Sequence, residues 1–107
     1  MKLPTLILLA ASLSLGACAN LIQTATISEA YKYYELQQYE RTLELITRAV
    51  NAEAMSAETK IELTYLKAKT YEGLGQREIA NTLYEYLVQE HSNSQYGYLA
   101  VKQLNAN

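Results

Sequence analysis

The feature that most constrains this chain is its shortage of residues that make turns. From residue 18 to the C-terminus it contains no proline and no aspartate, and only three of its four glycines lie there. Over the same stretch, apolar residues recur every three or four positions, which is the spacing of one face of an α-helix. No segment alternates between apolar and polar residues as a half-buried strand does. The sequence therefore predicts an all-α fold with short connections.

Periodicity and capping residues predict five helices. They cover about residues 26–36, 39–50, 57–73, 77–90 and 95–104. Ser28, Ser56 and Ser94 are the expected N-caps, because a serine hydroxyl accepts a hydrogen bond from a backbone N–H in the first turn. The side chains expected to face the core are Tyr39, Leu43, Ile46 and Val50 in the second helix, Ile61, Tyr65, Ala68 and Tyr71 in the third, Ile79, Ala80, Leu83, Tyr84 and Leu87 in the fourth, and Tyr98, Leu99, Val101 and Leu104 in the fifth.

An apolar run near the N-terminus is typical of an export signal. It extends from Leu6 to Leu15 behind Lys2, and it is much shorter than the roughly 20 residues that span a bilayer. The run ends in Leu15-Gly16-Ala17-Cys18, which resembles the lipobox of bacterial lipoproteins. The resemblance implies that residues 1–17 are a cleaved signal peptide and that Cys18, the only cysteine, carries acyl chains such as palmitate. An ordinary secretory signal with a chance cysteine is the alternative.

The lipobox resemblance also implies a location. Two or three acyl chains anchor a protein stably in a membrane, so the mature chain is expected in the bacterial cell envelope. Ala19 stands where an aspartate favours retention in the inner membrane of enteric bacteria, so we expect the outer membrane, facing the periplasm. Residues 18–25 are then a lipidated tether, and residues 26–104 a single helical domain. Residues 18–107 carry 8 Lys and Arg against 11 Glu without a basic patch, which argues against nucleic acid as a partner.

The helical region contains an internal repeat with a separation of 38 residues. The matched pairs are Ala30 with Ala68, Tyr33 with Tyr71, Gln37 with Gly75, Thr42 with Ala80, Ile46 with Tyr84, and Ala49 with Leu87. This pattern resembles the tetratricopeptide repeat (TPR), a helical hairpin with small and aromatic residues at fixed positions. The first copy departs from the pattern at Gln37 and Thr42. The period also exceeds the usual length of about 34 residues, and no proline closes the repeat.

The TPR resemblance implies about two stacked hairpins followed by a C-terminal capping helix. A hairpin of this kind cannot bury its apolar face alone, so neighbouring hairpins stack. An irregular bundle of four or five helices with the same core is the alternative. Because fewer than three repeats are marginal on their own, we expect a partner, which is either a protein of the cell envelope or a second copy of the chain.

The ten tyrosines, in a chain without Phe or Trp, are candidates for partner binding. Of these, Tyr33, Tyr39, Tyr71 and Tyr84 are expected to pack between helices. TPR proteins bind partners along a concave surface lined by the first helix of each hairpin. The resemblance implies that this surface includes Tyr31, Tyr34, Tyr65, Lys69 and Glu72. A tyrosine suits such a surface because its ring is apolar and its hydroxyl is polar. The alternative is that these side chains form the half-buried rim of a small domain.

We find no pattern of catalytic or metal-binding residues. His91, the only histidine, lies beside Ser92 without the glycines of a nucleophile elbow, and a histidine at a helix C-terminus has an ordinary electrostatic role. The pairs Glu40/Glu44 and Glu58/Glu62 lie one helical turn apart, as solvated helix faces commonly do. The sequence therefore predicts that the chain is not an enzyme and uses neither a cofactor nor a metal.

These patterns together predict an adaptor, or an accessory subunit of an envelope assembly or secretion machine. A lipoprotein that binds a small ligand or glycan, or inhibits an enzyme, is the alternative. A closed apolar pocket would favour that alternative, and an open groove would favour the adaptor. A third class, a linker between membrane and cell wall, would need basic residues near the C-terminus, where Lys102 stands alone.

Overall fold

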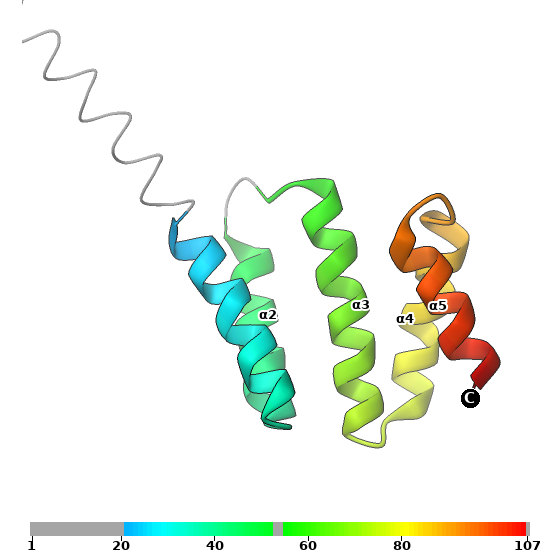
Figure 1. Cartoon of the computed structure of the whole chain (residues 1–107), viewed down its shortest axis with the longest axis horizontal. Coiled ribbons are helices and arrows are strands. Elements are labelled where there is room, and N and C mark those ends of the chain that lie inside the picture. Colours follow the sequence, from blue (N-terminus) through cyan, green and yellow to red (C-terminus); the bar gives the residue numbers. More distant parts are fainter. Residues whose placement is uncertain (1–20, 53–54, 107) are drawn as a thin grey trace, which may run out of the picture.

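The computed structural model describes residues 21–52 and 55–106, and every regular element in these ranges is an α-helix (Figure 1). A first helical segment covers residues 21–35. It is followed by α2 (Tyr39–Asn51), α3 (Ala57–Gly73), α4 (Arg77–Glu90) and α5 (Gln95–Ala106). The predicted all-α fold is confirmed, and α4 has the bounds expected from the sequence.

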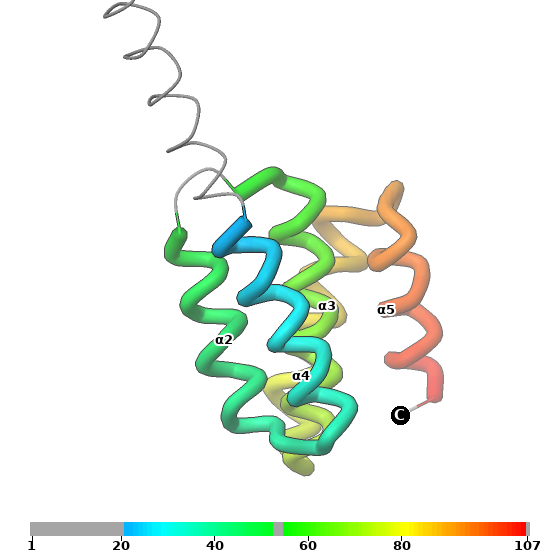
Figure 2. The backbone as a smooth tube through the Cα atoms, turned by 60° about the vertical axis from the view of Figure 1, so that its left-hand side comes forward, coloured from blue at the N-terminus to red at the C-terminus, as the bar shows by residue number. Residues whose placement is uncertain are grey.

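The helices form a row in which successive members run in opposite directions (Figures 1 and 2). α3 lies in the middle of this row and contacts α2, α4 and α5. One core lies between the first helical segment, α2 and α3, and it includes Ala30, Leu45 and Leu63. A second core lies between α3, α4 and α5 around Tyr84. The central helix therefore contributes to both cores.

This double role explains why the predicted core face of α3 is incomplete. The predicted residues Ile61, Tyr65 and Tyr71 are only half-buried, and they pack against the second core. Leu63 and Leu66 were not predicted to face the core, but they are 1% and 3% exposed and belong to the first core. A helix with neighbours on two sides buries more than one stripe, so a single periodic pattern does not describe it.

The predicted core face of α2 is partly wrong. Val50 is 41% exposed and Leu43 is half-buried, whereas Leu45 and Ala49 are buried together with the correctly predicted Ile46. Thr42 is also fully buried. Its hydroxyl donates a hydrogen bond to the carbonyl of Gln38 in the preceding turn, at 3.0 Å, and therefore has a partner without water. A threonine that satisfies its own hydroxyl in this way can occupy a core position.

The inward residues of α4 and α5 are also only partly as predicted. Ala80, Tyr84 and Leu87 are buried in α4, but Ile79 is 45% exposed. In α5 the buried positions are Gly97 and Ala100, while Tyr98 and Val101, expected inside, are 62% and 40% exposed. A Cβ at residue 97 would clash with the carbonyl oxygen of His91, so this glycine allows α5 to approach the end of α4. Small residues rather than large ones therefore mark the inner side of α5.

Two turns 38 residues apart have the same backbone geometry. Gln37 and Gly75 both have a positive φ, of 60° and 77°. The matched backbone N–H to carbonyl hydrogen bonds are Gln37 to Tyr34 and Gln38 to Tyr33 in the first turn, and Gly75 to Glu72 and Gln76 to Tyr71 in the second. Bonds of this kind satisfy carbonyl groups that the end of a helix leaves free. Residues paired by the 38-residue alignment thus occupy equivalent places in the two hairpins.

The first helical segment begins earlier than the sequence analysis predicted. Residues 21–25, expected to be part of the tether, are helical, and Ser28 lies inside the helix instead of capping it. The hydroxyl of Thr26 donates to the carbonyl of Ile22, as in a continuous helix. The predicted signal segment 1–17 and Cys18 lie outside the described residues. None of the helices described combines the length and apolar character needed to cross a membrane.

Candidate partner-binding face

Tyrosines and charged side chains from three helices gather along one side of the row. We name as the tyrosine face eight residues: Tyr31 and Tyr34 from the first helical segment, Glu58, Glu62, Tyr65, Lys69 and Glu72 from α3, and Tyr96 from α5. The five residues of α3 follow one another at spacings of four, three, four and three, which places them on one side of the helix. The periodicity of α3 is therefore what assembles the face.

Lys69 connects the first helical segment to α3 through aromatic contacts. Its Nζ lies 5.9 Å from the ring centroid of Tyr34 and 5.9 Å from that of Tyr65. An ammonium group at this distance is attracted by the negative face of an aromatic ring. The ring of Tyr34 also meets that of Tyr39 edge-on, with 5.7 Å between centroids. The lysine thus holds rings of two neighbouring helices together.

Tyr65 is the centre of a group of rings that joins α3, α4 and α5. Its centroid lies 5.9 Å from that of Tyr84 and 5.6 Å from that of Tyr96, and both pairs are tilted. Tilted aromatic pairs at this separation contribute about 0.5–1.5 kcal/mol beyond the burial of their area. The half-buried rings of Tyr65 and Tyr96 therefore have a fixed arrangement at the surface.

Two carboxylates of the face accept hydrogen bonds from tyrosine hydroxyls. Tyr31 donates to Glu62 Oε1 at 2.5 Å, and Tyr84 donates to Glu72 Oε2 at 2.9 Å. Burial, reinforced by these carboxylates, raises the pKa of both tyrosines well above the ordinary value of 10.0. The hydroxyls are therefore neutral donors at physiological pH, and they fix the positions of Glu62 and Glu72.

Burial also raises the pKa values of Tyr34 and Tyr96. Tyr39 adds to this rise at Tyr34, and the negative charge of Glu62 adds to it at Tyr96. With neutral tyrosines, the formal charges of the tyrosine face are three carboxylates and one ammonium group.

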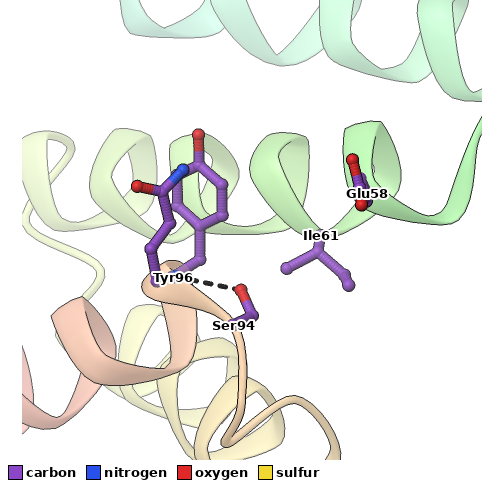
Figure 3. A pocket seen from close by; sticks show the side chains of 5 residues that line it. Glu58, Ile61, Ser94 and Tyr96 are labelled. Atoms are coloured by element: carbon purple, nitrogen blue, oxygen red, sulfur yellow. Dashed lines mark hydrogen bonds between the residues drawn. The ribbon is translucent and has the colours of Figure 1, made fainter.

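A hollow of about 280 Å³ lies where α3 and α5 begin, at one end of the tyrosine face. Figure 3 shows Glu58 and Ile61 of α3 opposite Ser94 and Tyr96, and the hollow is open to solvent. The backbone N–H of Tyr96 donates to Ser94 Oγ at 3.0 Å, so Ser94 caps α5 as predicted. Ser56 likewise accepts a hydrogen bond from the N–H of Thr59 and caps α3.

The structure brings together all five residues that the sequence predicted for the surface. These are Tyr31, Tyr34, Tyr65, Lys69 and Glu72, each of which is half-buried. Three residues of the face were not predicted for it: Glu58, Glu62 and Tyr96. Glu62 lies three residues before Tyr65, so helical spacing alone gave a usable signal for it. Tyr96 gave no such signal, because its place depends on how α5 packs against α3.

The remaining polar candidates lie elsewhere. His91 is the C-cap residue of α4, and its Nε2 lies 3.3 Å from the hydroxyl of Tyr86. Within residues 21–52 and 55–106, no three His, Cys, Asp or Glu side chains come together as a metal site would require. Comparison of the chain with known protein families, curated proteins and solved structures finds no match. The residues and their arrangement are therefore the basis for a functional proposal.

Proposed function

We propose that this chain is a lipid-anchored protein of the bacterial cell envelope that faces the periplasm and holds a protein partner on its tyrosine face. The observation that carries the adaptor role is the set of tyrosine rings presented by three helices. These rings are half-buried in the free chain, and each combines an apolar ring with a polar hydroxyl. Such residues are enriched at interfaces because they tolerate water when free and bury well when bound.

The two equivalent turns support a TPR-like stack as the scaffold for this role. Residues paired at a separation of 38, such as Ala30 with Ala68 and Ala49 with Leu87, are buried in both hairpins. The tyrosine face is supplied by the first helical segment and α3, which begin the two hairpins, and by α5, which follows the second hairpin. This is the arrangement through which stacks of helical hairpins present an extended binding surface.

A lipoprotein that binds a small ligand or glycan is the alternative proposal. Sites for small molecules are concave and bury most of the ligand surface. The hollow at Glu58 and Tyr96 is instead open to solvent, and the other residues of the tyrosine face on α3 lie beyond it along the helix. This geometry favours the adaptor.

Crosslinking in intact cells, followed by purification and mass spectrometry, tests the adaptor proposal. We expect the wild-type chain to recover one envelope complex, and the triple variant Tyr31→Ser/Tyr34→Ser/Tyr65→Ser to lose it. Because Tyr31, Tyr34 and Tyr65 also pack against the cores, Lys69→Glu serves as a second variant that removes no core side chain. Tyr86→Ser/Tyr98→Ser is the matched control, since these tyrosines are 47% and 62% exposed and lie outside the face.

Two outcomes would overturn the adaptor role. One is recovery of the same partner with the triple variant and with Lys69→Glu. The other is recovery of the chain alone. The anchor is tested separately, because Cys18→Ala should move the protein from the membrane fraction to the soluble fraction and remove the acyl mass from the N-terminal peptide. A lipid-free wild-type N-terminus would contradict the lipoprotein proposal.

A further inference from the structure

The charges of the tyrosine face are unevenly distributed along α3. Glu58 lines the hollow at the beginning of the helix and Glu62 follows one turn later, whereas Lys69 lies one turn beyond Tyr65. Lys69 is also occupied by its contacts with the rings of Tyr34 and Tyr65. The end of the face formed by α3 and α5 is therefore anionic and aromatic, with no cationic residue of the face beside it.

The carboxylate of Glu62 is held in place by one hydrogen bond and can accept more. The Tyr31 hydroxyl bonds to its Oε1, while Oε2 accepts no hydrogen bond from the described residues. A carboxylate has two oxygens and about four lone-pair sites, so it can accept further donors from outside. The role of Glu58 in the first turn of α3 is explained by the helix dipole, but Glu62 lies beyond that turn and has no such explanation.

The side chains around these carboxylates limit what can bind there. The rings of Tyr65 and Tyr96, 5.6 Å apart, are presented at fixed angles by α3 and α5. A guanidinium group is planar, stacks on aromatic rings and donates paired hydrogen bonds to a carboxylate. An ammonium group is a strongly hydrated point charge that lacks the planar stacking. The combination of rings and carboxylates therefore fits arginine better than lysine.

We infer that the tyrosine face docks an extended segment of a protein partner through an arginine side chain. The guanidinium group enters the hollow lined by Glu58 and Tyr96, and the carboxylate of Glu62 and the ring of Tyr65 complete its site on the adjoining part of the face. This inference rests on the proposed adaptor role and specifies the chemistry of the partner. The partner segment is basic at this end of the face, because charge complementarity selects it and like charges are rejected.

Binding of defined peptides to the full chain, purified in detergent, tests this inference. The probe is a fluorescent Gly/Ser peptide with a pair of arginines, compared with peptides that carry lysines or glutamates at the same positions. We expect the arginine peptide to bind most tightly, the lysine peptide more weakly, and the glutamate peptide about tenfold more weakly or not at all. Fluorescence anisotropy at low and high salt measures each affinity.

A matched pair of variants separates the proposed site from general charge effects. Glu58→Gln/Glu62→Gln should weaken binding of the arginine peptide about tenfold, and glutamine keeps an acceptor for the Tyr31 hydroxyl. Glu40→Gln/Glu44→Gln removes carboxylates with the same spacing from the exposed side of α2 and should leave the affinity unchanged. Unchanged affinity of the Glu58/Glu62 variant would overturn the inference. Equal binding of the glutamate peptide would also overturn it, as would the absence of any binding up to about 1 mM.

Failure of this inference is distinguishable from failure of the adaptor role. If the peptides show no preference for arginine but the cellular partner is still lost on changing Tyr31, Tyr34 and Tyr65, the adaptor remains and the arginine site is wrong. If crosslinking in cells recovers only the chain itself, the adaptor role fails, and the inference about its partner fails with it.

Discussion

Gln37 and Gly75 occupy the same place in two equivalent turns, but only glycine suits that place. Both residues have a positive φ, of 60° and 77°. For a residue with a Cβ this conformation costs roughly 1–2 kcal/mol, a cost that glycine avoids. Glycine in turn loses more chain entropy on folding, by about 0.5–1 kcal/mol. The difference between these costs determines the stability effect of each residue.

Exchanging the two turn residues should therefore have opposite effects on the free energy of unfolding. We expect Gln37→Gly to raise it by about 0.5 kcal/mol and Gly75→Gln to lower it by about the same amount. The double exchange should lie close to the wild type, because the two expected effects are similar in size and opposite in sign. Urea unfolding followed by circular dichroism measures all three variants. A destabilised Gln37→Gly would show that the first turn does not need glycine geometry.

At the scale of elements, the sequence predicted the helices more reliably than the faces that they bury. Ser56 and Ser94 mark helix starts correctly, because each follows a clear break in the pattern. Ser28 does not, since residues 21–27 contain no residue that stops a helix. The buried faces depend on neighbours, and α3 has them on two sides. The buried residue Leu63 of α3 was therefore not predicted to face the core. On α4 the opposite error occurred, because Ile79 was predicted to face the core but is exposed.

Leu63 and Ile79 provide a direct test of this correction. Leu63 is 1% exposed in the first core, so Leu63→Ala should lower the free energy of unfolding by about 2–5 kcal/mol. Ile79 is 45% exposed, and Ile79→Ala should change it by less than about 1 kcal/mol. Thermal unfolding of the wild type and of each variant measures these changes in the free energy of unfolding. Similar losses for the two variants would contradict the placement of α3 between the cores.

At the scale of the whole molecule, the 38-residue alignment and the TPR resemblance selected Tyr31 and Tyr34 from the first copy and Tyr65, Lys69 and Glu72 from the second. Helical spacing accounts for the position of the last three on one side of α3. Neither the alignment nor helical spacing placed Tyr96, because its position depends on how α5 packs against α3 and α4, and Gly97 is what allows α5 to approach the end of α4. A local pattern can thus select the residues of one helix, but the completed face depends on tertiary packing.

The buried tyrosines also make the stability of the molecule sensitive to alkaline pH. The folded protein raises the pKa of Tyr31 and Tyr84 above the unfolded value of about 10. Their contribution to stability is therefore complete below about pH 10 and is lost as the pH rises through the folded pKa values. We expect the melting temperature to fall above pH 10, and to fall less steeply in Tyr84→Phe. Thermal melts between pH 8 and 12, with tyrosinate absorbance recorded in parallel, provide the measurement, and equal pH dependence in both proteins would contradict it.

The ring contacts have a practical consequence for spectroscopy. The chain contains no tryptophan, and its ring pairs connect particular helices: Tyr34 with Tyr39 links the first helical segment to α2, while Tyr65 links α3 to Tyr84 of α4 and Tyr96 of α5. Near-ultraviolet circular dichroism disappears when aromatic side chains lose fixed packing, even if the helices persist. The junction of the first helical segment with α2 and the junctions of α3 with α4 and α5 therefore contain intrinsic chromophores, so loss of packing at these junctions can be followed optically without attaching a dye.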